Sequence, residues 1–150
     1  MKNILKSQKM NIALVRATLF TVAVSGATAS SAEVVVVVSA RSTVSSLTAA
    51  QITKIFLGKT NIFPDGSNAV PLDQAEGAEV RSEFYAKVTN KDAAQLNAYW
   101  SKIIFAGDGQ QPKVVSGNAG VRKAVASNPN AIGYIDRSAV DDSVKVLLTP

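Results

Sequence analysis

The sequence contains no cysteine and no histidine. Without cysteine, the protein has no disulfide framework, no thiol nucleophile and no thiolate metal site. Without histidine, it lacks the commonest general base and the commonest zinc ligand. These two absences argue against most hydrolase mechanisms, so we expect a protein that is not an enzyme and that uses no metal and no cofactor.

The first 32 residues contain no acidic residue and have the layout of a secretory signal peptide. A positive n-region is formed by Lys2, Lys6, Lys9 and Arg16. The apolar run at 17–24 is far shorter than the ~20 residues that a membrane-spanning helix needs. We expect cleavage after Ala32, with Ala29 as the alternative, which leaves a periplasmic protein that starts at Glu33.

The charge balance changes when this segment is removed. The whole sequence has 16 basic and 11 acidic residues, and the loss of four basic residues leaves 12 against the same 11. The mature chain is therefore near +1 rather than +5. Because nucleic-acid binding depends on a clustered positive surface, we expect no nucleic-acid partner.

Residues 33–150 are long enough for one domain with a buried core. The unbroken β-branched run at 34–38 predicts a strand buried on both faces of a mostly parallel sheet. Further short strands are expected at 69–72, 113–115, 131–135 and 144–148. Helical patterns alternate with these strands, and this order is typical of an α/β domain.

Four amphipathic helical patterns lie between the expected strands. Two have the spacing of a capping box, with Thr48 before Gln51 and Asp92 before Gln95. The second helix is recognised by apolar residues at four-residue spacing, from 80 to 88. Pro129 ends the fourth, because proline has no N–H and moves the residue before it out of the α region.

Hydroxyl residues are crowded in the segment after the first strand, and Ser42 and Ser45 are among them. In doubly wound sheets, ligands bind outside the carboxyl ends of the strands. Hydroxyls and free N–H groups there could hold an anion at the start of the next helix. The alternative is a turn and a cap that only satisfy the backbone.

A second polar cluster precedes the second helix. Gln74 and Arg81 could bind an oxyanion together with the N–H groups at the helix start. The alternative is that Asp73, Glu76 and Glu79 complement the helix dipole themselves and repel a phosphate.

A third cluster opens the fourth helix, where Ser116, Gly117 and Asn118 are followed by Gly120. Glycine N–H groups approach an anion without obstruction by a side chain. The motif has no Gly-Lys-[Ser/Thr] ending and too few glycines for a dinucleotide fingerprint, so it predicts neither a nucleotide nor a dinucleotide site.

Two segments together resemble a known family. The first runs from Ile52 to Lys59 and contains Ile-Phe-Leu-Gly-Lys, and the second runs from Asn128 to Asp136 and contains Asn-Pro-x-Ala-Ile-Gly-Tyr. The chain resembles the periplasmic phosphate-binding proteins of ABC transporters, and the resemblance extends over most of residues 34–147. Such receptors have two α/β lobes that close on the ligand. The resemblance implies a single three-layer α/β domain that corresponds to one lobe of a type II periplasmic binding protein.

The resemblance also implies a ligand and partners. In phosphate-binding members an Arg and a Gly-Ser-Gly-Thr-Ser-like run wrap the phosphate, whereas here the equivalent stretch at 73–80 has carboxylates and only Gly77 fits the pattern. We expect non-covalent binding of phosphate or another small anion. The open face would be covered by an ABC transporter membrane component or by a second copy. The alternative is an envelope protein-interaction module that has no small-molecule ligand.

Overall fold

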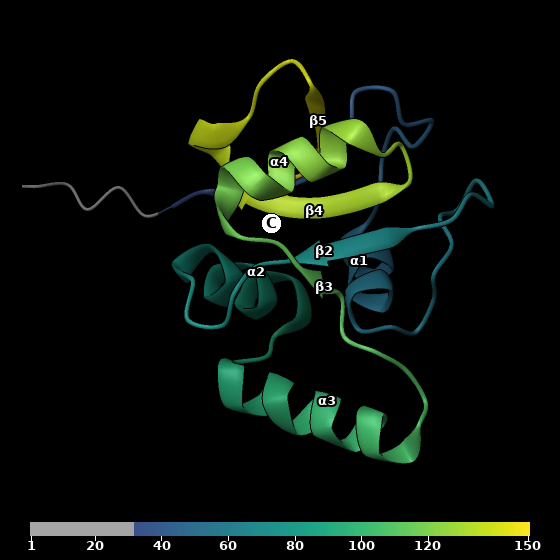
Figure 1. The fold of residues 1–150 in the computed structure, drawn as a ribbon, viewed down its shortest axis with the longest axis vertical. Coiled ribbons are helices and arrows are strands. Elements are labelled where there is room, and N and C mark those ends of the chain that lie inside the picture. Colours follow the sequence, from purple (N-terminus) through teal and green to yellow (C-terminus); the bar gives the residue numbers. More distant parts are fainter. Residues whose placement is uncertain (1–31) are drawn as a thin grey trace, which may run out of the picture. The chain divides into compact units, whose positions relative to one another are not determined.

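A computed structural model describes residues 32–150, so all of the predicted signal peptide except Ala32 lies outside the described residues. No helix in this part of the chain is long and apolar enough to cross a membrane. In chain order the elements are β1 (Val34–Ser39), α1 (Ala49–Phe56), β2 (Val70–Asp73), α2 (Glu79–Thr89), α3 (Ala93–Ala106), β3 (Lys113–Val114), α4 (Gly117–Ser127), β4 (Ala131–Asp136), the 3₁₀ helix η1 (Arg137–Ala139) and β5 (Val144–Leu148) (Figure 1).

The five strands form one sheet in the order β3-β2-β4-β1-β5. β2 runs parallel to both β3 and β4, but β1 runs antiparallel to both of its neighbours, β4 and β5. The expectation of a mostly parallel sheet is therefore wrong, and the sheet is mixed. The valine run established burial on both faces, but burial does not determine the direction of a strand.

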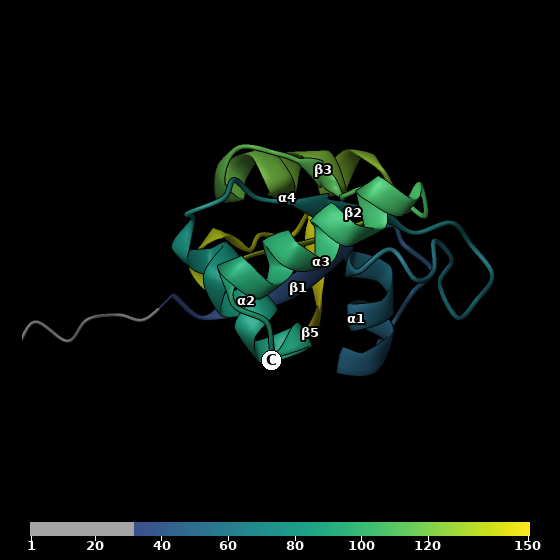
Figure 2. The ribbon, with the colours of Figure 1, turned by 90° about the horizontal axis from the view of Figure 1, so that it is seen from below.

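The side chains of β1 confirm that both faces of the sheet are covered. Val34, Val36 and Val38 pack in the core beneath α1, α2 and α3, whereas Val35 and Val37 pack in the core beneath α4. All five are fully buried. Figure 2 shows α4 on one side of the sheet and α1 and α2 on the other, which confirms a three-layer α/β domain.

The predicted capping boxes begin α1 and α3. The Thr48 hydroxyl accepts from the Gln51 N–H, and the Gln51 side chain accepts from the Thr48 N–H. Asp92 and Gln95 make the same reciprocal pair before α3. These local bonds fix where both helices start, because they satisfy N–H groups that have no partner within the helix.

α4 lies close to β4 because Gly133 has no side chain. A Cβ atom built on Gly133 would lie 2.6 Å from Val121 Cγ1 and 3.2 Å from Val125 Cγ2, both on α4. A glycine inside a strand often marks such a close approach, and here it allows α4 to pack directly against β4.

α3 lies beyond the β3 edge of the sheet (Figure 1). It buries only part of its surface. Leu96 and Trp100 face inward and join the core with α1 and α2. On the outer side, Phe105 is 95% exposed and Ile104 is 53% exposed. α3 therefore presents large apolar side chains to solvent.

Candidate functional site

Three strands have their carboxyl ends along one edge of the sheet, which runs across the strands rather than along β3 or β5. Two helices begin at this edge. β2, β3 and β4 run in the same direction, so their carboxyl ends meet at this edge. α2 follows β2 and α4 follows β3, which places the first turns of both helices at the same edge. In open α/β sheets, ligands bind in this position.

Gln74 and Asn118 connect the elements at this edge. The buried Gln74 side chain donates from Nε2 to Asn118 Oδ1 and to the Tyr134 carbonyl oxygen, each at 3.0 Å. Asn118 Oδ1 also accepts from the Asp136 N–H at 3.2 Å. The two bonds hold Asn118 by its oxygen, and its Nδ2 amide has no hydrogen-bond partner among residues 32–150.

The helices at this edge differ from α1 and α3 in their caps. Ala78 precedes α2 and Ser116 precedes α4, and neither residue makes a side-chain cap bond. α4 has no acidic residue in its first turn, whereas α2 has Glu79. The first turn of α4 therefore has no acidic side chain to compensate the positive end of the helix dipole. Within the described residues no side chain caps its N–H groups, so these groups can bind an anion.

Two glycines open the backbone near these helix starts. Gly77 has φ of 87° and Gly117 has φ of 71°, values that L side chains rarely adopt. No atom lies within 4 Å of the position that a Cβ would take at either glycine. Both backbones are therefore accessible from solvent.

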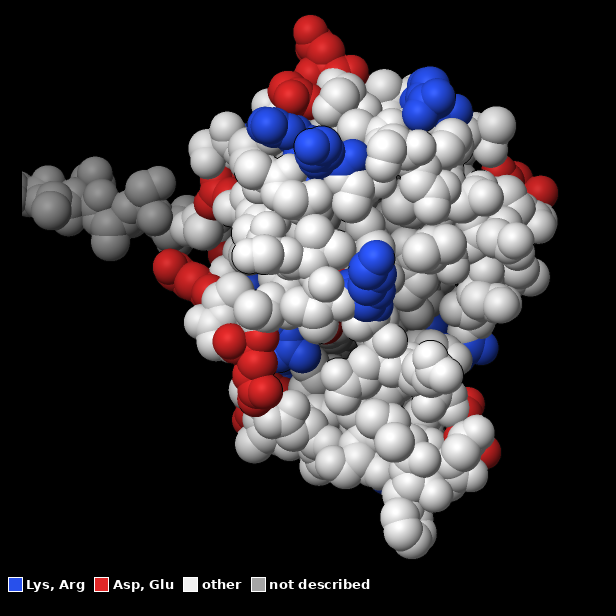
Figure 3. Space-filling model, in the orientation of Figure 1, with Lys and Arg blue, Asp and Glu red and all other residues white. Residues whose placement is uncertain are grey.

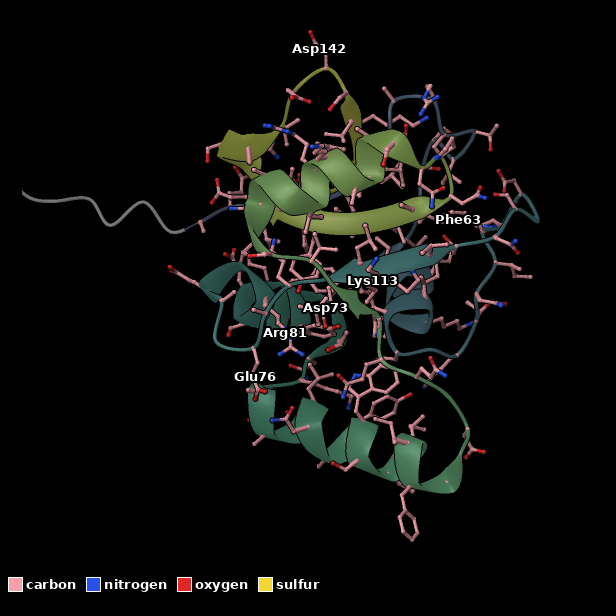
Figure 4. All side chains as sticks on the ribbon, in the orientation of Figure 1. Phe63, Asp73, Glu76, Arg81, Lys113 and Asp142 are labelled. Atoms are coloured by element: carbon pink, nitrogen blue, oxygen red, sulfur yellow. The ribbon has the colours of Figure 1, made fainter. Side chains whose placement is uncertain are left out.

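Arg81 lies in a buried polar cluster next to this edge. Its Nε is 3.3 Å from both carboxylate oxygens of Asp73, and its guanidinium lies 5.1 Å from the centre of the Tyr85 ring. Arg81 is 8% exposed and Asp73 only 2%. Figure 4 shows Arg81 below Asp73, between α2 and α3.

The Asp73 carboxylate has a full set of donors. It accepts from the Gln74 N–H at 2.8 Å, from the Tyr85 hydroxyl at 3.0 Å and from the Tyr134 hydroxyl. Burial, and after it the nearby Asp73 carboxylate, raises the pKa of the Tyr85 and Tyr134 hydroxyls well above the ordinary value. Both tyrosines therefore remain protonated, and each donates a hydrogen bond to the Asp73 carboxylate in the core.

The structure does not bring Ser42 and Ser45 to this edge. Ser39 at the end of β1 donates to the Ala126 carbonyl, near the C-terminus of α4, whereas Asn118 lies in the first turn of α4. Because β1 runs antiparallel to β4, its carboxyl end lies at the opposite edge from those of β2 and β4. Ser42 accepts from the Val44 N–H, and Ser45 lines a separate surface pocket.

The other six predicted residues, Gln74, Gly77, Arg81, Ser116, Gly117 and Asn118, lie on or beside the start of α2 or α4. The sequence interpretation assigned Asp73 to the helix dipole and did not foresee its pairing with Arg81, Tyr85 and Tyr134. The sequence carried one signal for this pairing. Asp73 directly follows the expected apolar strand at 69–72, and a buried Asp is almost always paired.

Among residues 32–150, no three Asp or Glu side chains lie together in a way that could hold a metal ion.

No family model matches the sequence, and no curated protein matches it. Solved structures match with TM-scores near 0.6. One, assigned as a phosphate ABC transporter substrate-binding protein from Clostridium perfringens and solved with bound phosphate, has a TM-score of 0.62 and 25% identity over 77% of this chain and 44% of its own.

Two further structures support the same fold. An ABC-type phosphate transport receptor from Vibrio cholerae has a TM-score of 0.61 and 19% identity over 77% of this chain and 45% of its own. PstS from Borrelia burgdorferi has a TM-score of 0.58 and 15% identity over 77% of this chain and 46% of its own. The chain is thus similar to phosphate ABC transporter substrate-binding proteins and spans a little less than half of their length.

Proposed function

We propose that this protein is an exported, non-enzymatic binding protein for phosphate or a similar small anion. The observation that carries the proposal is the start of α4. Among residues 32–150, no side chain caps its first N–H groups, the Asn118 side-chain amide has no hydrogen-bond partner, and its first turn has no acidic residue. Its similarity to a protein solved with bound phosphate supports the same ligand class.

The anion would bind mainly to α4. Gly117 allows close approach to the backbone, and Gln74 holds Asn118 in place. Ser116 is exposed, and its hydroxyl has no hydrogen-bond partner in the described part of the chain. Glu79 opposes an anion at α2, and Arg81 is already paired with Asp73. A site on one face of a single lobe leaves its ligand half solvated, so we expect weak affinity unless a membrane component of a transporter or a second copy covers it.

The experiment is a thermal-shift titration with phosphate and sulfate on the protein and on Ala119→Glu. Residue 119 is the third position of α4, so a glutamate there completes a capping box with Ser116. The variant should be about 0.5–1 kcal/mol more stable, because the box satisfies the helix start. It should also lose the response to phosphate, because its carboxylate takes the place of the anion.

Ala50→Glu is the matched control. It adds the same charge to the first turn of α1, which follows β1 at the opposite edge of the sheet. At about 100 times its dissociation constant, phosphate should stabilise the unmodified protein and this control by about 2.7 kcal/mol. A phosphate response that survives in Ala119→Glu would refute the site.

A second candidate function is protein interaction through α3. Lys102 is its only charged residue, and Figure 3 shows the part of the surface formed by α3 as mainly uncharged. The exposed residues Ala94, Ala98, Ser101 and Phe105 lie on one face. These four positions are spaced symmetrically about the middle of the helix. If two copies packed α3 against α3 in antiparallel orientation, the Phe105 of each copy would lie on the small Ala94 of the other.

Sedimentation velocity tests this alternative. A dimer that becomes monomeric in Phe105→Ser, together with no anion response, would favour the interaction module. A monomer at every concentration would exclude self-association through α3.

A further inference from the structure

A pocket of about 290 Å³ lies between α2 and the first turns of α3. Tyr85 and Ala86 from α2 and Ala93 and Leu96 from α3 form apolar walls. Arg81 lines the same pocket, and Figure 3 shows the surface hollowed above α3, where Figure 4 places Arg81. The volume is close to the lower end of the range for small-molecule sites.

The guanidinium of Arg81 is fixed in place but is not saturated. Asp73 engages its Nε, and the Tyr85 ring lies against its face. Nη1 and Nη2 make no hydrogen bond with residues 32–150, although the side chain is only 10% exposed. A nine-tenths buried cation with two free donor groups therefore borders an apolar pocket.

We propose that this pocket binds a small organic carboxylate with a short aliphatic body. The two terminal nitrogens of a guanidinium match the two oxygens of a carboxylate, and the resulting pair of charge-assisted bonds is strong in a partly buried position. The apolar walls would cover the aliphatic part, which neither phosphate nor sulfate possesses. The site is distinct from the α4 site of the proposed function and takes a different ligand.

The charges around the pocket fit an anion. The lining contains Arg81, Lys91 and Asp92, which together carry a net charge of +1, and the Asp73 carboxylate that pairs with Arg81 is not part of the lining. Asp92 is occupied as the cap of α3, where it accepts from the Gln95 N–H at 2.8 Å. Asp73 accepts from the Nε–H of Arg81, so the two terminal nitrogens of Arg81 are left for a ligand. Preorganisation of this kind reduces the cost of binding.

Amide and arginine side-chain NMR spectra test the proposal, with butyrate as the probe and butyramide as its uncharged analogue. Butyrate should shift the Arg81 Nε–H signal and the amide signals of Ala93 and Leu96 in a saturable way. Butyramide should bind at least tenfold more weakly, because it loses the charge-assisted bonds.

Two variants locate the site without disturbing the buried ion pair. Ala93→Phe fills the pocket from an exposed position at the start of α3 and should abolish the butyrate shifts. Ala94→Phe adds the same group one residue later, outside the pocket lining, and should leave them unchanged. Far-ultraviolet circular dichroism confirms that both variants are folded.

The results separate this proposal from the α4 site. Ala119→Glu should remove the phosphate response and keep the butyrate response, and Ala93→Phe should do the opposite. No butyrate shift at tens of millimolar, equal binding of butyramide, or butyrate binding that persists in Ala93→Phe would each overturn the proposal.

Discussion

At the scale of single residues, Gly133 sets how closely α4 approaches the sheet. Gly133→Ala would place its Cβ 2.6 Å from Val121 Cγ1, so α4 must shift or Val121 must change rotamer. Overpacking of this kind costs about 1–3 kcal/mol, and urea unfolding should show a loss of that size. The cost should shrink in a Val121→Ala background, since the two positions are in contact. An unchanged midpoint for the single variant would contradict this packing.

Asp65 provides a second test at the residue scale. Hydrogen bonds from Ser67, and after it from Thr43, lower the pKa of the Asp65 carboxyl to about 2. Because the folded value lies below the ordinary 3.8, the stabilisation is complete above pH ~4 and is lost as the pH falls towards 2. Carbon-13 NMR titration should show a higher Asp65 pKa in Ser67→Ala and a smaller rise in Thr43→Val. Equal pKa values in all three proteins would show that these bonds do not form in solution.

At the scale of helices, α3 starts with a side-chain cap and α4 does not, so removing the cap residue should change stability in α3 but not in α4. Asp92→Ala should cost about 1 kcal/mol, because it removes a capping box from α3. Ser116→Ala should cost almost nothing, because the Ser116 side chain makes no cap bond with α4. Thermal unfolding of both variants checks the comparison. Equal losses would mean that Ser116 caps α4 after all, and the proposed anion site would then lose its free N–H groups.

The same scale shows what could be predicted from the sequence. The two capping boxes were identified because their signals lie within a few neighbouring residues. The direction of β1 was not, because a run of five valines reports burial on both faces and nothing about the neighbouring strand. Because of this error, Ser42 and Ser45 were predicted to lie with the other site residues, whereas they lie at the opposite edge of the sheet.

The partner of Arg81 was missed for a related reason. Its pairing with Asp73 depends on how α2 turns back over the end of β2, which residue spacing alone does not specify. Tyr134 reaches the same carboxylate from β4, 61 residues away along the chain. A contact between residues so far apart in the sequence can be recognised only when the order of the strands in the sheet is known.

At the scale of the whole molecule, the buried tyrosines predict how stability responds to alkali. The pKa values of Tyr85 and Tyr134 are raised in the folded protein, mainly by burial. Above pH ~10 the unfolded chain releases these protons and the folded protein does not, so stability falls with rising pH. Each tyrosine contributes a loss of about 1.4 kcal/mol per pH unit.

Tyrosinate absorbance followed during an alkaline titration measures this directly. Tyr99, which is half-buried and whose pKa burial raises less, should ionise while the protein is folded. The absorbance of Tyr85 and Tyr134 should rise only together with unfolding. In Tyr85→Phe the loss per pH unit should be about half as steep. Ionisation of all three tyrosines before unfolding would contradict the buried cluster around Asp73.

The proposed function requires that a small anion binds where α4 begins. The most direct measurement is the change in amide NMR shifts over a phosphate titration of the whole protein. We expect saturable shifts for the Gly117, Asn118 and Ala119 amides and for the Asn118 side-chain amide. The absence of shifts at millimolar phosphate, or shifts confined to the Ser42 and Ser45 edge, would contradict it.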